Sequence, residues 1–366
     1  MPYPRRRTRS LVAFTTILIA TAAILYAVAS PLLGGSSGRN ALPSWFLNEE
    51  AGTNRVSVID TLENSFNSII PGHWNANRMH GSSDMSLDDD TVHGGATDPE
   101  PVAVPARAVS RPYRDSAPVA GKVFFDTPDG PRACSGTAVR DPARPGTSNL
   151  VWTAGHCVHK GAGGSWFRNI VFVPSYNDQG LAKAAAQRAP LSKIAPFGTW
   201  WADGVETSPQ WISKGKDNGG PGAAFDFAVL HVRPPADASS LQESLGDAAT
   251  VRFDVPAVTS ISSVTVLGYP AAAPFSGEEL FACQGRPSRL SVGTKDEPTM
   301  YRTGCTMTSG SSGGGWFSSS ADGSFTLVSN TSIGGSNNTW IAGPYLGRQA
   351  QDTYTSVSER FSVSDQ

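Results

Sequence analysis

The sequence predicts an all-β protein, and three observations support that fold class. The chain has 366 residues with 38 Gly and 27 Pro, and only 16% of its residues are charged. From about Pro118 onward it consists of short apolar runs rich in Val, Phe, Thr and Trp, which are typical of strands. Gly, Pro, Asn or Asp bounds these runs, as turns between strands require. About 250 residues of this kind predict one all-β unit of two barrels or sandwiches.

The expected strands follow one another with turn residues between them. They are "VAGKVFF" at 119–125, "CSGTAV" at 134–139, "LVWTAG" at 150–155, "NIVFVPSY" at 169–176, "FDFAVLHV" at 225–232, "SVTVLGYP" at 263–270, "FTLVSNTSI" at 325–333 and "NTWIAGPYLG" at 338–347. The tail "RQAQDTYTSVSERF" has fewer breakers, and it predicts a short closing helix at 348–361.

The first 29 residues have the features of an export signal. Four arginines within residues 5–9 precede an apolar run from Leu11 to about Ala29, and "AVA" at its end fits cleavage before Ser30. The run is also near the ~20 residues that span a bilayer, so residues 1–29 are either a signal peptide or a signal anchor. The A-x-A ending favours cleavage, which predicts a secreted protein rather than a membrane-anchored one that faces outward.

The next segment, residues 30–115, differs from the rest of the chain. It has no cysteine, contains "LDDD" and ends in a Pro-rich stretch. Such a segment buries little apolar area, so we expect it to be loosely ordered. It is either a flexible spacer or a pro-segment cut within the arginine-containing stretch 107–114, and we favour the pro-segment. Residues 116–366 then form the folded domain.

Charge and cysteine content limit the kinds of partner. The net charge of −2 gives no reason to expect nucleic acid. An even count of four cysteines in an exported chain predicts two disulfides. No C-x-x-C pair is present, and His156, Cys157 and His159 have no matching second pair, so we expect no metal site.

Three motifs carry the residues that acyl transfer by serine requires. This chemistry needs a hydroxyl nucleophile, a base, an acid that orients the base, and N–H groups for the oxyanion. His156 lies in "TAGHC", Asp226 in "AFDFAVLHV" and Ser312 in "TSGSSGGGW". Asp203 and Asp217 are rival acids, but both lie in loops without a strand that would bury them.

Together the motifs resemble those of the chymotrypsin superfamily of serine peptidases. "TAGHC" is similar to its histidine motif, "DFAVL" to its aspartate motif and "GSSGG" to its G-x-S-G-G serine motif, in the order His, Asp, Ser. The stretch from about 118 to 350 resembles the secreted bacterial trypsin-like and glutamyl-endopeptidase (V8-like) branch. The resemblance implies two six-stranded Greek-key β-barrels, at about 118–235 and 250–350, with the active site in the cleft between them.

The resemblance also assigns roles to residues. Ser312 would be the nucleophile, His156 the base and Asp226 the acid that orients it. The G-x-S-G-G frame selects Ser312 over its serine neighbours and makes the N–H groups of Gly310 and Ser312 the oxyanion hole. No cofactor is implied. His159 and His231 are expected to be surface or structural residues.

The same resemblance implies how the four cysteines pair in disulfides. Cys134 would pair with Cys157 beside the base, and Cys283 with Cys305 before the serine loop. The first bridge closes a loop of about 23 residues, which would stabilise the fold by about 3 kcal/mol in the chain-entropy model.

Two departures from the family pattern concern activation and specificity. Ser311 stands where the chymotrypsin branch has an Asp that pairs with a freed N-terminal amine, so that ion pair cannot form here. The substrate pocket is expected at Thr306, Ser309 and Ser332, with no acid to pair with Arg or Lys. We therefore expect a secreted, monomeric serine endopeptidase, made as a zymogen and acting on proteins or peptides. The alternative is a catalytically inactive protease-fold binding protein at the cell surface.

Overall fold

The computed structural model describes residues 69–85, 87–88, 96–217, 219–255, 258–293, 297–319 and 325–362. These residues all belong to one compact unit, Arg55–Gln366. The predicted export signal and the first part of the predicted spacer lie outside the described residues. Among the residues that are described, no helix is long and apolar enough to cross a membrane.

The first half of the folded domain is a closed barrel of six strands. Its strands are β4 (Ala120–Thr127), β5 (Gly130–Val139), β6 (Leu150–Thr153), β7 (Arg168–Pro174), β8 (Trp200–Thr207) and β9 (Ala228–Arg233). They follow the order β5-β4-β7-β8-β9-β6, and pairing of β5 with β6 closes the sheet. Val123, Val151, Phe172, Trp200 and Leu230 fill the interior, each fully buried. The strands of this barrel run from residue 120 to residue 233.

The second half consists of two sheets. Their strands from this half are β10 (Thr250–Val251), β11 (Val264–Gly268), β12 (Phe281–Gly285), β13 (Ser288–Leu290), β14 (Met300–Gly304), β15 (Gly315–Ser319), β16 (Phe325–Asn330), β17 (Ile333–Gly334) and β18 (Trp340–Gly343). One sheet has the order β10-β16-β15-β11-β12-β3 and the other β13-β14-β18-β17-β2. Val266, Trp316, Val328 and Ile341 pack between them. The all-β, two-barrel architecture predicted from the sequence is confirmed, with this half divided into two sheets.

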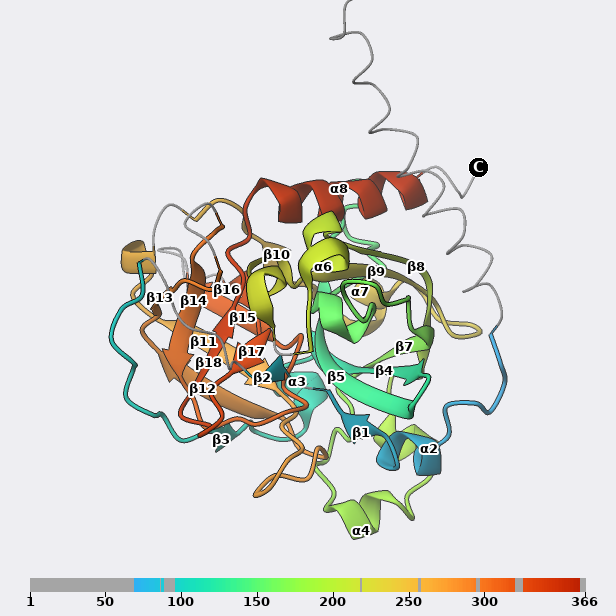
Figure 1. Cartoon of the computed structure of the whole chain (residues 1–366). Coiled ribbons are helices and arrows are strands. Elements are labelled where there is room, and N and C mark those ends of the chain that lie inside the picture. The colour runs from blue at the N-terminus through green and yellow to red at the C-terminus, as the bar shows by residue number, and fades with distance from the viewer. Residues whose placement is uncertain are drawn as a thin grey trace, which may run out of the picture. The chain divides into compact units, whose positions relative to one another are not determined.

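Short helices connect the strands, and one longer helix closes the chain. The short ones include α3 (Tyr113–Ser116), α4 (Lys183–Ala186), α5 (Leu191–Ile194), α6 (Pro209–Lys214), η3 (Gly220–Phe225), α7 (Leu241–Leu245) and η4 (Val258–Ser260). The predicted closing helix is α8 (Arg348–Ser362), drawn in red in Figure 1. Its buried residues Ala350, Thr353, Tyr354, Val357 and Ser358 recur every three to four positions, which defines one face.

The described part of residues 69–115 is packed against the domain, so the expectation of a loosely ordered segment is corrected. It contributes α2 (Ala76–His80), β1 (Ser83–Asp84), β2 (Leu87–Asp88) and β3 (Arg107–Ala108). Trp74, Met79 and Tyr113 are buried in it, at 3%, 1% and 0% exposed. The average composition of the segment is polar, but these few large side chains supply its contacts.

Each short strand of this segment extends a sheet of the domain. Strand β1 pairs with β5, β2 with β17 and β3 with β12. In Figure 1 the blue elements β1 and α2 lie against the first barrel, while β2 lies beside β17.

Candidate active site

His156 lies where strand β6 ends. Residues Gly155–Cys157 form a single 3-10 turn, η2, directly after this strand. The small residue before the histidine is required, because a Cβ on Gly155 would lie 2.6 Å from Thr207 Oγ1. The close approach of a neighbouring strand therefore fixes the backbone that carries the imidazole.

The four cysteines form the two disulfides that the resemblance implied. Cys134 of β5 is bonded to Cys157, and Cys283 of β12 to Cys305. The first bridge ties the turn that carries His156 to the neighbouring strand. Side-chain ligand atoms of Cys134, His156 and Cys157 lie within 4.8 Å of one another, but both sulfurs are in the disulfide and offer no thiolate to a metal.

Asp226 holds His156 through two contacts. Its Oδ2 lies 2.7 Å from the imidazole Nδ1, and its Oδ1 accepts the backbone N–H of His156 at 2.7 Å. Both side chains are buried, at 0% and 2% exposed. Because an ionised carboxylate can only accept, Nδ1 carries the proton and Nε2 is the basic nitrogen. Within the described residues Nε2 has no hydrogen-bond partner, so it is available to accept a proton.

Two residues of the second half hold Asp226. Ser332 Oγ donates to Asp226 Oδ2 at 2.6 Å, and the Asn330 amide donates to the backbone oxygen of Asp226 at 3.0 Å. Asn330 also accepts the indole N–H of Trp152 at 2.9 Å. The Ser332 hydroxyl offsets part of the free-energy cost of burying the carboxylate charge, and the Asn330 amide fixes the backbone that carries it.

The Ser332 side chain is engaged by Asp226, and the expectation that Ser332 belongs to the substrate pocket stays a prediction. The hydroxyl is buried, 1% exposed, and is engaged with Asp226. The sequence carried a signal for it, since the polar run "SNTS" at 329–332 interrupts an otherwise apolar strand region. Polar side chains buried in a strand need partners, and a buried acid is one that accepts.

Ser312 lies on a tight turn that two glycines make possible. Gly310 and Gly313 have φ values of +91° and +78°, which residues with a Cβ rarely adopt. A Cβ on Gly313 would lie 2.2 Å from Thr153 Oγ1 and 3.0 Å from the backbone N of Ala154. Ala154 is two residues before His156, so the serine turn and the histidine turn are in contact.

Ser135 of β5 fixes the serine turn to the first barrel. Its backbone N–H donates to Ser312 O at 2.7 Å, and its hydroxyl donates to Gly310 O at 2.9 Å. The same hydroxyl accepts the N–H of Tyr269 at 3.0 Å. Ser135, next to Cys134, thus contacts both residues that the sequence assigned to the oxyanion hole, Gly310 through its hydroxyl and Ser312 through its backbone N–H.

The other expected pocket residues contact the segment that precedes the domain. Thr306 Oγ1 accepts the N–H of Ala106 at 2.9 Å. Ser309 Oγ donates to a carboxylate oxygen of Asp84. Both hydroxyls are therefore engaged by residues 69–115.

The rival acids do not contact the imidazole of His156. Asp203 Oδ1 lies 2.6 Å from Nδ1 of His231, whose ring stacks on Phe361 at 3.8 Å. This buried arrangement agrees with a structural role for His231. Asp217 lines a pocket that also includes His156.

That pocket lies beside His156 and has a volume of about 320 Å³. Charged, aromatic and aliphatic side chains share its wall. They are Met85, Thr127, Pro128, Asp129, Arg132, His156, Lys160, Phe167, Trp211 and Asp217. Both signs of charge are present, so the pocket gives no single charge preference.

His159 is buried three residues after His156. It is 4% exposed, and its Nδ1 accepts the N–H of Gly161 at 3.0 Å, which requires the neutral ring. Burial lowers the pKa of His159 to about 4. His159 is thus a neutral structural residue, as the sequence predicted.

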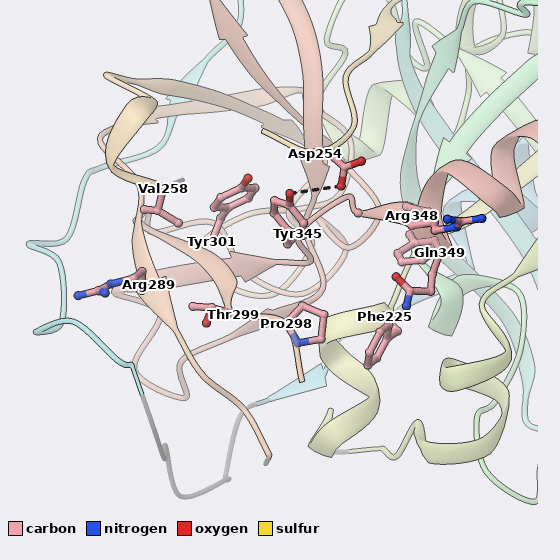
Figure 2. A pocket seen from close by; sticks show the side chains of 13 residues that line it. Phe225, Asp254, Val258, Arg289, Pro298, Thr299, Tyr301, Tyr345, Arg348 and Gln349 are labelled. Atoms are coloured by element: carbon pink, nitrogen blue, oxygen red, sulfur yellow. Dashed lines mark hydrogen bonds between the residues drawn. The ribbon is translucent and has the colours of Figure 1, made fainter. Parts of the chain in front are cut away.

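A second cavity, of about 400 Å³, lies at the start of α8 and is shown in Figure 2. Arg348 and Gln349 border it on one side and Tyr301 and Val258 on the other, and the Tyr345 hydroxyl donates to Asp254 Oδ1 at 3.3 Å. None of the three motif residues lines it.

Comparison with known proteins places the chain in a family. The model of the trypsin-like peptidase domain matches residues 134–325, which is just over half of the chain. The chain belongs to the trypsin-like peptidase family. As a member of that family it is a serine endopeptidase, and its substrates are proteins or peptides.

Solved structures of serine proteases are similar to this peptidase. The thermostable serine protease AL20 from an extremophilic microorganism is 31% identical, covering 67% of this chain and 99% of that one, with a TM-score of 0.53. The protease Anisep from Arthrobacter nicotinovorans is 28% identical, covering 69% and 99%, with a TM-score of 0.52. A Glu endopeptidase is 18% identical, covering 72% and 100%, with a TM-score of 0.48. No curated protein matches the chain. The glutamyl-endopeptidase branch stays a prediction.

Proposed function

We propose that Ser312, His156 and Asp226 are the catalytic triad of this endopeptidase. The observation that carries the proposal is the state of His156: Asp226 Oδ2 lies 2.7 Å from Nδ1, and Nε2 is without a partner among the described residues. An imidazole held in this tautomer acts as a general base at Nε2. The serine turn touches the backbone next to this base, which favours Ser312 as the nucleophile.

The mechanism follows from these positions. Ser312 Oγ attacks the peptide carbonyl while His156 Nε2 takes its proton, and Asp226 supports the resulting imidazolium. The backbone N–H groups of Gly310 and Ser312 donate to the oxyanion. The C–N bond then breaks, and His156 returns the proton to the leaving amine. Water, activated by the same imidazole, hydrolyses the acyl-enzyme and releases the carboxylate product.

A fluorophosphonate adduct tests this assignment. On processed protein that lacks residues 30–115, we expect mass spectrometry to find one adduct on Ser312, and none on Ser312→Ala. The matched control is Ser311→Ala, whose hydroxyl donates to Thr308 O at 2.7 Å and has no part in the mechanism. An adduct that persists in Ser312→Ala would contradict the assignment. Absence of any adduct on processed protein that lacks residues 30–115, with both disulfides intact, would favour the inactive binding protein.

We also propose that the enzyme is a secreted monomer, made as a zymogen. The arginine-led apolar run at 1–29 and the two disulfides support export. N-terminal sequencing of the exported protein should give a chain that begins at Ser30. A chain that still begins with the apolar run would instead indicate a membrane-anchored protein that faces outward.

A further inference from the structure

A short stretch of the segment before the domain bridges the two halves at the proposed active site. Strand β1 (Ser83–Asp84) pairs in parallel with Arg132–Ala133 of β5, in the first barrel. Two residues later, β2 (Leu87–Asp88) pairs in parallel with Ile333–Gly334 of β17, in the second half. Figure 1 shows β2 beside β17. The stretch therefore spans from the strand that carries Cys134 to the strand that follows Ser332.

Met85 lies between these two strand pairs, and its backbone is bonded on both sides. Its N–H donates to Ala133 O at 3.1 Å, and its carbonyl oxygen accepts the N–H of Gly310 at 3.1 Å. Gly310 N–H is one of the two proposed oxyanion donors. The Met85 side chain lines the pocket that contains His156. A carbonyl of the chain itself thus occupies a donor that a substrate carbonyl would need.

We propose that residues 83–85, with β2, are an autoinhibitory latch that closes the active site of the full chain. This inference rests on the proposed function, because it identifies Gly310 as an oxyanion donor. The latch excludes a peptide from the edges of β5 and β17 and from Gly310 N–H at the same time. Its removal or displacement is the activating step.

Charge also holds the latch in place. The Asp84 carboxylate accepts the hydroxyl of Ser309, in the turn before Gly310. Lys122 lies buried nearby, with Nζ donating to Gly277 O at 3.0 Å. Burial lowers the pKa of Lys122 to about 8, and the carboxylates of Glu278 and Asp84 act against that shift. The ammonium group is thus a buried positive charge that attracts the latch.

The chain is anchored before and after the latch. Before it, the Trp74 indole donates to Asn169 O at 2.6 Å, and His80 Nδ1 lies 2.9 Å from a carboxylate oxygen of Glu278. After it, Asp98 forms an ion pair with Arg289 at 2.7 Å. Attachment at both ends keeps the latch at a high effective concentration beside the cleft. The latch itself has only short parallel pairings, which are the less stable kind, so it can be displaced once an anchor is lost.

The test uses two full-chain variants and one control. Met85→Pro removes the N–H donor to Ala133, and Asp84→Asn removes the latch charge without changing the backbone. The control is Ile69→Pro, which introduces a proline at an exposed position of the same segment, before the helix α2. Initial kcat/KM is measured on a peptide substrate while mass spectrometry shows the chain intact. Relative to the unchanged full chain, we expect kcat/KM to rise at least tenfold for Met85→Pro and by less for Asp84→Asn. We expect no change in kcat/KM for Ile69→Pro.

Hydrogen exchange gives a readout that needs no activity. In a Ser312→Ala background, which prevents self-processing, the Gly310 amide should exchange at least tenfold faster when Met85→Pro is added. Equal exchange of the Gly310 amide with and without Met85→Pro would overturn the latch and leave the proposed function standing. The same conclusion would follow if the chain and the Met85→Pro variant had equal kcat/KM and equal fluorophosphonate labelling of Ser312. No labelling in any variant would overturn the proposed function, and the autoinhibitory role with it.

Discussion

The two halves of the molecule hold their parts of the site in different ways. In the first half, side chains do the positioning: Asp226 holds the His156 imidazole, and a disulfide braces the turn. In the second half, the backbone positions the turn that carries Ser312, through the positive φ of Gly310 and Gly313. Side-chain hydrogen bonds can be removed one at a time, whereas a turn without room for a Cβ fails as a unit.

Each half also braces the other. Ser332 and Asn330 of the second half hold Asp226, while Ser135 of the first half holds the turn that carries Ser312. The comparison teaches that neither half contains all the residues of the proposed site. It predicts that side-chain changes around Asp226 lower kcat by graded amounts. Changes in the serine turn should lower kcat because an added Cβ displaces the turn.

The largest expected effect follows from Asp226→Asn. The amide keeps the shape but favours the wrong imidazole tautomer, so kcat should fall by about 10⁴-fold. The matched control is Asp203→Asn, because Asp203 bonds His231 instead. Steady-state kinetics on a peptide substrate measure both. Equal losses in the two variants would break the distinction between the triad acid and a structural one.

Gly313→Ala tests the steric side of the comparison. Its Cβ would overlap Thr153 Oγ1 at 2.2 Å and Ser135 O at 2.4 Å, so the serine turn must shift. A displacement of about 1 Å costs on the order of 10²-fold in kcat. Gly146→Ala is the control, since Gly146 also has a positive φ, +87°, but open space around it. If the two variants retain equal kcat, the turn is not fixed by packing.

Ser332→Ala distinguishes a brace from a pocket wall. Loss of a hydrogen bond to a charged group costs about 1.5–3 kcal/mol, so kcat should fall roughly 10- to 100-fold. Ser329→Ala is the control, because its hydroxyl donates to Pro344 O at 2.8 Å. A rise in KM at constant kcat would instead assign Ser332 to substrate binding.

The smallest effect concerns stability in acid. Burial lowers the pKa of His159 to about 4, below its usual value of about 6.5 in the unfolded chain. Between these values the unfolded chain binds more protons, so the free energy of unfolding falls as pH falls from about 6.5 to 4. The slope from this residue is at most about 1.4 kcal/mol per pH unit. His159→Gln should flatten it in denaturant titrations at several pH values, and parallel curves would contradict the assignment.

The strands and the closing helix were predictable from local sequence, because each signal lies within a few residues, such as the alternation of apolar runs and turns. The contact between His156 and Asp226, 70 positions apart, was expected from the family resemblance of their motifs. The pairing of Cys134 with Cys157 and of Cys283 with Cys305 came from the family resemblance, because spacing alone permits other pairings.

The latch and the brace on Asp226 were not predictable in the same way. β1 and β2 are two residues each, and they pair with residues about 50 and 250 positions away, which no periodicity reveals. Ser332 shows the same limit. The family resemblance placed Ser332 in the wall of the substrate pocket, but only the three-dimensional structure shows that its hydroxyl reaches Asp226.

The central claim is that a nucleophile in one half is activated by a base in the other. The rate of Ser312 phosphonylation by a fluorophosphonate measures that activation directly, without dependence on substrate preference. It should be compared between the Met85→Pro protein and the same protein carrying His156→Ala. The account predicts a fall on the order of 10³-fold or more when the imidazole is removed. Equal labelling rates, with both disulfides intact, would contradict it.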